Sequence, residues 1–150
     1  VADVPANPEA VRSILSAEAI VLGPGSLFTS LLPNILGNDI ASSVANSRAL
    51  KIYVTNVATQ DGETDDYSVM MHVNTIFQHV GDLFPVILCN NVQMGDLMSN
   101  MEWVQIDDGY DENYEIIARD LIDVQYPWRH DSDKLALEIL SVIKNYKLSN

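Results

Sequence analysis

The chain has 150 residues, of which 47% are hydrophobic, which is enough for one domain with a substantial core. Its 21 acidic and 8 basic residues give a formal net charge of −13. This balance argues against duplex nucleic acid or an anionic membrane surface as a partner, because both attract a basic surface. A small phosphorylated ligand is not excluded, since it needs only local N–H donors and one arginine or a metal ion.

The cellular compartment is indicated by cysteine content and hydrophobic runs. The single cysteine, Cys89, lies in an apolar segment and has no partner for an internal disulfide, which fits a reducing cytoplasm. No apolar run reaches the roughly 20 residues of a membrane span. The first residues lack the basic-then-apolar pattern of a signal peptide. We therefore expect a cytoplasmic protein with no membrane insertion.

The first predicted elements are a helix and a strand. Residues 7–9 (Asn-Pro-Glu) supply an N-cap, a first-turn proline and an acidic residue at the positive helix end. We expect this helix to end near Ala17 and to bury Leu15. Residues 20–22 (Ile-Val-Leu) form a continuous apolar run, which is typical of a strand covered on both faces.

A glycine turn follows this strand. Gly23 and Gly25 allow a sharp turn and a close approach to a ligand, Pro24 stiffens the loop, and Ser26 can cap the next helix. Free N–H groups, the positive end of a helix and glycines without a Cβ favour the binding of an anion, most often a phosphate. The same turn also occurs in α/β proteins that bind nothing there, so both interpretations remain open.

The segment from residue 27 to residue 54 predicts two short helices and a strand. Leucines at 27, 31 and 32 indicate one to two helical turns that end near Pro33. Asn38 or Asp39 can cap the next short helix. Residues 49–54 (Ala-Leu-Lys-Ile-Tyr-Val) have the composition of a second strand.

The second half of the chain continues the alternation of predicted helices and strands. Residues 69–80 carry an apolar stripe with helical spacing, and Gly81 is its expected C-cap. Residues 85–89 predict a third strand, and residues 103–106 and 115–118 are shorter strand candidates. A final helix begins after Asp131 or Ser132.

Alternating strands and helices predict an α/β fold, with a parallel sheet and right-handed crossovers. The carboxyl ends of parallel strands meet at one edge of the sheet, where ligands bind. We expect the turn at 23–26, the loop at 56–66 and the corner at 90–91 to lie at this edge.

The loop at 56–66 is long and polar. The amides of Asn56 and Gln60 can both donate and accept, as recognition of a base or sugar requires, and Thr59 and Glu63 lie beside them. The loop's four carboxylates could hold a hard divalent ion or form a solvated acidic surface. The solvated interpretation is favoured for residues 65 and 66.

Two further residues are candidates for ligand contacts. His72 lies near the start of a predicted helix and thus near the ligand edge, although a lone helical histidine is more often structural. Arg129 precedes the last helix and is suited to grip a phosphate. The alternative for Arg129 is a surface ion pair with Asp131 or Asp133.

Several of these segments together resemble a known family. They are residues 20–34 (IVLGPGSLFTSLLPN), residues 59–64 (TQDGET), His72 with Val73, and residues 129–131 (RHD). They resemble the gluconeogenesis factor (YvcK-like) family, which is related to the CofD-like 2-phospho-L-lactate transferases. The resemblance extends from about Pro5 to the last helix.

The resemblance implies a three-layer α/β fold with a Rossmann-like parallel sheet. YvcK-like proteins are cytoplasmic, bind UDP-sugars and support growth and cell shape on gluconeogenic carbon sources. CofD-like proteins use a guanine nucleotide and magnesium to transfer a phospholactyl group. By resemblance, the ligand is a nucleotide-sugar, magnesium is the one cofactor suggested, and no residue is assigned to catalysis. The implied ligand-binding residues are Gly23, Pro24, Gly25, Ser26, Thr29, Asn56, Thr59, Gln60, Glu63, Thr64, His72 and Arg129.

The length of the chain differs from that of the family. Whole members are about twice as long and open with a glycine-rich strand–turn that does not occur here. The chain, taken as one α/β domain over residues 1–150, therefore resembles the carboxyl-terminal half of a member. A half of this kind leaves apolar sheet surface uncovered, so we expect a homo-oligomer.

Overall fold

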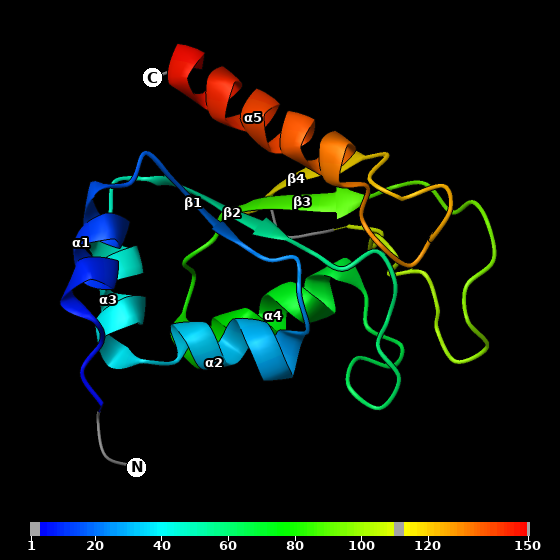
Figure 1. Cartoon of the computed structure of the whole chain (residues 1–150), viewed down its shortest axis with the longest axis horizontal. Helices are drawn as coiled ribbons and strands as arrows, with labels where there is room; N and C mark the ends of the chain where they lie inside the picture. Colours follow the sequence, from blue (N-terminus) through cyan, green and yellow to red (C-terminus); the bar gives the residue numbers. More distant parts are fainter. Residues whose placement is uncertain (1–3, 110–112, 150) are drawn as a thin grey trace.

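A computed structural model describes residues 4–109 and 113–149. Its centre is a four-stranded parallel sheet in the order β1-β2-β3-β4 (Figure 1). The strands are β1 (Ala19–Leu22), β2 (Leu50–Val54), β3 (Val86–Asn90) and β4 (Glu115–Arg119). The helices are α1 (Pro8–Ser16), the π-helical turn η1 (Leu27–Leu31), α2 (Leu32–Ile35), α3 (Asn38–Asn46), α4 (Val69–Val80) and α5 (Ser132–Ser149). Within the described ranges, none of the helices has the length and hydrophobicity to cross a membrane.

Helices cover both faces of the sheet, which confirms the predicted three-layer α/β fold. On one face, side chains of η1, α2 and α4 pack against alternate residues of the strands, including Leu22, Tyr53 and Ile87. On the other face, Leu135, Ile139 and Val142 of α5 pack against the remaining strand residues. Figure 1 shows α5 on one side of the sheet and α2 and α4 on the other. This alternation follows from the two-residue period of a strand.

The predicted helix starts are confirmed where a side chain can reach a free amide. The Asn7 side chain accepts a hydrogen bond from the Glu9 amide at 2.8 Å, and Asp131 Oδ1 accepts from two amides in the first turn of α5. Gly81 is the residue that caps α4, with a φ of 80° that suits glycine. At α3, however, Gly37 occupies the N-cap position, so the prediction that Asn38 or Asp39 caps this helix was wrong.

Other predictions failed because tertiary contacts override local patterns. The prediction that β1 is covered on both faces was wrong, because Leu22 is buried on one face whereas Val21, on the other, is 38% exposed. Leu15 is 49% exposed, although its spacing placed it on the buried side of α1. Pro33 does not end the helix, because proline is tolerated in a first turn and lies in that of α2. The predicted strand over residues 103–106 does not form. Only Trp103 of this segment makes a β-bridge, which pairs it with Ala58.

Candidate functional site

An open groove lies at the carboxyl ends of the strands, where the sequence predicts ligand binding. It has a volume of about 460 Å³, within the range of small-ligand sites. The turn after β1, the loop after β2 and the segment before α5 all contribute side chains. The lining residues are Pro24, Gly25, Ser26, Asn56, Val57, Ala58, Thr59, Gln60, Met101, Trp128, Arg129, His130, Ser132 and Leu135.

The glycine turn has a structural part and an exposed part. Gly23 has a φ of +88°, and a Cβ built on it would lie 2.6 Å from the Val54 carbonyl oxygen. Only glycine fits there without strain, because the turn crosses the end of β2 so closely. The Gly23–Pro24 peptide is cis. Gly25 and Ser26 line the groove, and none of the hydrogen bonds found among the described residues uses their amides.

Ser26 joins the turn to the polar loop. Its hydroxyl lies 2.9 and 2.8 Å from the two carboxylate oxygens of Glu63, and it accepts a bond from the Thr29 amide at 3.1 Å. The Ser26 and Thr29 hydroxyls are also hydrogen-bonded to each other. Ser26 is thus the N-cap that the sequence predicts, and a negative charge already lies beside this helix end. Glu63 and Thr29 lie next to the groove rather than in its lining.

The loop after β2 presents amide groups on a rigid frame. Asn56 Nδ2 donates to Gln60 Oε1 at 3.2 Å, and both side chains line the groove. The Thr59 hydroxyl is buried and accepts from the Glu102 amide, and the Thr64 hydroxyl accepts from the Gln60 amide. Thr64 is therefore a support of the loop and does not line the groove, whereas Asn56 and Gln60 retain donors and acceptors for a ligand.

Arg129 also lines the groove and has no carboxylate partner among the described ion pairs. Among residues 4–109 and 113–149, Arg119 forms an ion pair with Glu138, whereas Arg129 forms none. The expected alternative pair with Asp131 or Asp133 is absent from these described ion pairs. Its guanidinium carbon lies 5.7 Å from the centre of the Tyr126 ring. An uncommitted guanidinium in an acidic chain is well suited to an anionic ligand.

His130 is a groove residue that the sequence analysis did not select. Burial lowers the pKa of His130 to about 4, and a hydrogen bond with the Thr55 backbone offsets part of this effect. Its ring is therefore neutral at neutral pH, and its buried Nε2 atom has no hydrogen-bond partner in the described part of the chain. His130 could have been predicted as a groove residue, because it lies next to Arg129 in the segment that joins a strand to the last helix. The same argument applies to Trp128.

His72, by contrast, is not brought to the groove. It is fully buried in α4, its Nδ1 atom lies 2.8 Å from the Ser68 carbonyl oxygen, and its ring packs edge-on against Tyr67. Burial lowers the pKa of His72. Asn90, at the corner after β3, is buried as well, and its amide bonds to the Val92 carbonyl and the Leu121 amide. Both residues support the frame around the groove.

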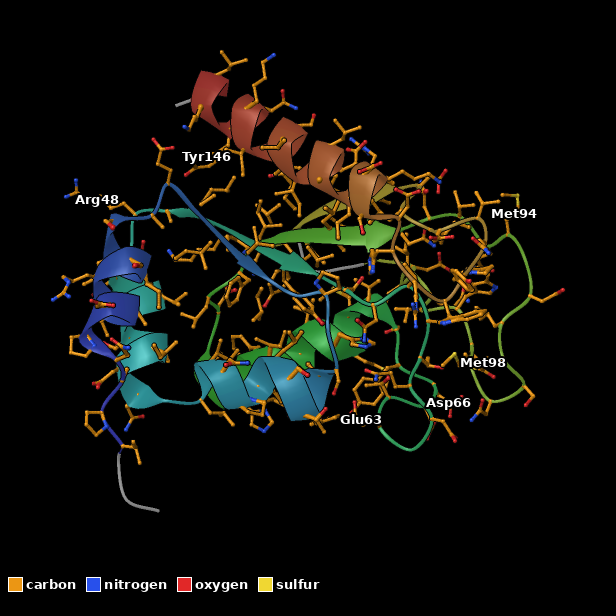
Figure 2. All side chains as sticks on the ribbon, viewed as in Figure 1. Arg48, Glu63, Asp66, Met94, Met98 and Tyr146 are labelled. Atoms are coloured by element: carbon orange, nitrogen blue, oxygen red, sulfur yellow. The ribbon has the colours of Figure 1, made fainter. Side chains whose placement is uncertain are left out.

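The acidic residues of the loop lie near one another without converging on one point. Asp61 accepts from Asn100 Nδ2 at 2.7 Å, and Asp65 accepts from the Gly62 amide at 3.0 Å. Glu63 and Asp66 occupy the same end of the molecule, opposite Arg48 and Tyr146 (Figure 2). Across the described ranges, no group of three or more His, Cys, Asp or Glu side chains has the spacing to hold a metal ion.

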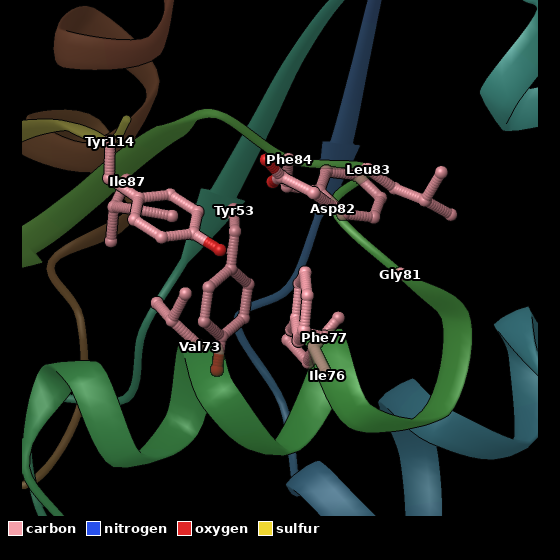
Figure 3. Close-up of a pocket in the computed structure, with 10 residues that line it drawn as sticks. All are labelled: Tyr53, Val73, Ile76, Phe77, Gly81, Asp82, Leu83, Phe84, Ile87 and Tyr114. Carbon is pink, nitrogen blue, oxygen red and sulfur yellow. The ribbon is translucent and has the colours of Figure 1, made fainter. Parts of the chain in front are cut away.

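A second cavity, beneath α4, is too small for a ligand. It is lined mainly by apolar and aromatic side chains, among them Tyr53, Phe84 and Tyr114 (Figure 3). Its volume is about 10 Å³, close to the minimum for one water molecule. Burial raises the pKa of Tyr53, which keeps its hydroxyl neutral. A larger hollow, of about 520 Å³, lies at the amino ends of the strands. The groove is the candidate site because ligands of parallel α/β sheets bind at the carboxyl ends of the strands.

The fold and the groove define an α/β protein with a groove of small-ligand size at the carboxyl edge of a parallel sheet. Residues 1–147 match the family model described as "2-phospho-L-lactate transferase CofD". The chain therefore belongs to the CofD family. A "Gluconeogenesis factor" from Listeria innocua is 34% identical over 92% of this chain and 45% of the relative. A relative from Aquifex aeolicus is 40% identical over 97% of this chain and 48% of the relative.

A solved structure supports the same assignment. The crystal structure of a UPF0052 family member from Bacillus halodurans matches with a TM-score of 0.81 and 32% identity, over 89% of this chain and 46% of that protein. The chain thus spans about half the length of these relatives. The family and fold inferred from the glycine turn, the TQDGET segment and the RHD segment are confirmed.

Proposed function

We propose that this chain binds a nucleotide-sugar of the UDP-sugar type and acts as a regulatory protein of gluconeogenic growth and cell shape in the cytoplasm. The observation that carries the proposal is Arg129, which lines the same groove as the glycine turn and has no carboxylate partner among the described ion pairs. Gluconeogenesis factors among the relatives support the physiological part of the proposal.

The groove offers three kinds of contact that match the parts of such a ligand. The amides of Gly25 and Ser26 and the guanidinium of Arg129 suit a diphosphate. The side-chain amides of Asn56 and Gln60 suit the donors and acceptors of a base or a sugar. Magnesium, in this proposal, enters with the phosphates and meets the carboxylate of Glu63, since Mg²⁺ is commonly bound through one or two carboxylates plus substrate phosphates.

Isothermal titration calorimetry with UDP-N-acetylglucosamine, with and without magnesium, tests the proposal. We expect saturable binding by the chain and loss of binding in Gly25→Trp, whose side chain would fill the turn. A thermal melt of the variant controls for misfolding. Absence of heat from the wild-type chain at millimolar ligand contradicts the proposal.

A second candidate is a nucleotide-dependent 2-phospho-L-lactate transferase. The description of the matching family model favours it. Incubation with a GDP-linked phospholactate and a deazaflavin acceptor, followed by mass spectrometry, separates the two candidates. Formation of the phospholactyl product supports the transferase, and binding of a UDP-sugar without turnover supports the regulatory protein.

We also propose that the chain forms a homo-oligomer through β1. The edge strand Ala19–Leu22 has four apolar residues and neither charge nor proline, which are the usual protections of an edge. Sedimentation equilibrium is expected to show a dimer that Val21→Lys disrupts. A monomer at several hundred micromolar contradicts self-association.

A further inference from the structure

Tyr126 is the aromatic partner of the arginine in the groove. The guanidinium carbon of Arg129 lies 5.7 Å from the centre of the Tyr126 ring, within the range of a cation–π contact. The chain holds 21 acidic residues. Even so, the ion pairs of the described ranges engage Arg119, Lys134 and Lys147 and leave Arg129 with this neutral ring.

Two carboxylates near Arg129 in sequence, those of Asp123 and Asp131, are bonded to backbone amides instead. Asp123 Oδ1 accepts from the Gln125 amide at 2.7 Å and the Tyr126 amide at 2.9 Å. Asp131 Oδ1 accepts from the Asp133 and Lys134 amides at 2.9 Å each, as the cap of α5. These bonds shape the segment and leave the guanidinium without an internal counter-charge.

The Tyr126 ring is itself fixed by its neighbours. The backbone carbonyl of Tyr126 accepts a hydrogen bond from the Arg129 amide at 2.8 Å, and this bond closes a turn. Its ring meets the Trp128 ring edge-on, with centres 5.6 Å apart and planes at 68°. Trp128 packs in turn against the cluster of Val57, Ala58 and Ile122. A chain of contacts therefore connects this small core to the ring and the ring to the guanidinium.

We propose that Tyr126 is a positioning residue that holds the Arg129 guanidinium ready for an anionic group in the groove. An aromatic face restricts the arginine without cancelling its charge, whereas a carboxylate would compete with the ligand. Preorganisation of this kind strengthens binding, because the ligand does not have to order a long flexible side chain. The assignment rests on the proposed function, since the anion it serves is the phosphate group of that ligand.

Two variants separate the ring from the rest of the tyrosine. Tyr126→Phe keeps the aromatic face, and Tyr126→Leu removes it with a similar apolar volume. With UDP-N-acetylglucosamine and with inorganic pyrophosphate, we expect Tyr126→Phe to bind as the wild type does and Tyr126→Leu to bind about two- to fivefold more weakly. Tyr146→Leu, a half-exposed tyrosine at the other end of the molecule, is the matched control (Figure 2).

Coupling to Arg129 distinguishes positioning from a structural role. In an Arg129→Gln background, Tyr126→Leu should weaken binding no further, because the ring then has no guanidinium to hold. An equal loss in both backgrounds overturns the proposal. So does wild-type affinity in Tyr126→Leu.

A ligand-free measurement keeps this test separate from that of the proposed function. The ring current of Tyr126 should move the Arg129 side-chain resonances upfield in the wild type and in Tyr126→Phe, and not in Tyr126→Leu. If no form of the chain binds either probe, the proposed function fails while this shift still decides the positioning. Unshifted Arg129 resonances in the wild type overturn the proposal.

Discussion

Two segments line the same groove and use charge in opposite ways. In the turn after β1, the Ser26 hydroxyl bonds to the carboxylate of Glu63, so an internal anion lies beside the free amides of the turn. In the segment before α5, the carboxylates of Asp123 and Asp131 bond to backbone amides, and Arg129 remains uncommitted. One side thus offers neutral donors next to a negative charge, and the other offers a free positive charge.

This difference shows that net charge says little about a binding site. The chain has a formal charge of −13, yet hydrogen bonds to the backbone place two carboxylates where they do not neutralise the arginine. Exposed charges act over short distances in salt solution, so the local arrangement decides what the groove attracts. An anionic ligand in the groove would meet Arg129 directly and Glu63 only behind Ser26.

Disrupting the turn should have the largest effect. Gly23→Ala places a Cβ 2.6 Å from the Val54 carbonyl oxygen at a φ of +88°. Steric overlap and the left-handed backbone should together cost about 3 kcal/mol of unfolding free energy. Thermal denaturation should show a melting temperature lower by roughly 6–12 °C. Gly25→Ala should lower the melting temperature less, because its Cβ would lie 3.2 Å from a Leu31 methyl and 3.7 Å from Ser30 Cβ, and no backbone atom is among these neighbours. Equal losses in the two variants would contradict this account.

Removing the free charge should act on binding alone. Arg129→Gln should weaken UDP-N-acetylglucosamine binding by roughly 10- to 100-fold, since a hydrogen bond to a charged group is worth about 1.5–3 kcal/mol. Calorimetry measures the affinity, and the melting temperature should stay the same because the side chain is exposed. Arg119→Gln, which removes an exposed arginine paired with Glu138, is the control and should bind normally. Equal affinity in both variants would rule out Arg129 as the phosphate contact.

Acidification should destabilise the segment before α5. The pKa of His130 in the folded chain is about 4, below its value in the unfolded chain, so the unfolded state binds the proton first. The free energy of unfolding should therefore decrease by about 2 kcal/mol as the pH drops from about 6.5 toward 4. Urea denaturation across this range measures the change. His130→Gln should reduce the dependence and leave the part that comes from His72, whose pKa burial also lowers. His79→Gln, at an exposed histidine, should leave the dependence intact, and the reverse pattern would contradict the assignment.

Removing the internal anion should have the smallest effect. Glu63→Gln takes a negative charge from beside Ser26, so without magnesium we expect pyrophosphate to bind about fivefold more tightly. With magnesium, the proposed carboxylate contact to the ion is lost, and the variant should gain less affinity from the metal than the wild type does. Calorimetry in the two buffers measures both values. Weaker binding by the variant in both buffers would show that Glu63 contacts the ligand directly.

Much of the candidate site was predictable from local sequence. The Gly23–Ser26 turn, the Asn56 and Gln60 amides, and Arg129 each follow a strand or precede a helix, and parallel strands bring such positions to one edge. His130 and Trp128 were missed, because a residue type and a spacing do not reveal which neighbours of Arg129 point into a groove. Thr64 was selected from the family motif and His72 from its place near a predicted helix start, and the structure places both in supporting positions outside the groove.

The sequence by itself determined the order of strands and helices, the helix caps at Asn7, Asp131 and Gly81, and the family, because these depend on local patterns and contiguous motifs. Only the tertiary structure decided that β1 lies at an edge, that Ser26 is bonded to Glu63, and that the Arg129 guanidinium lies over the Tyr126 ring. These features join residues brought together by folding, and their energies depend on burial and on the competition among nearby partners. No local pattern in the chain encodes that competition.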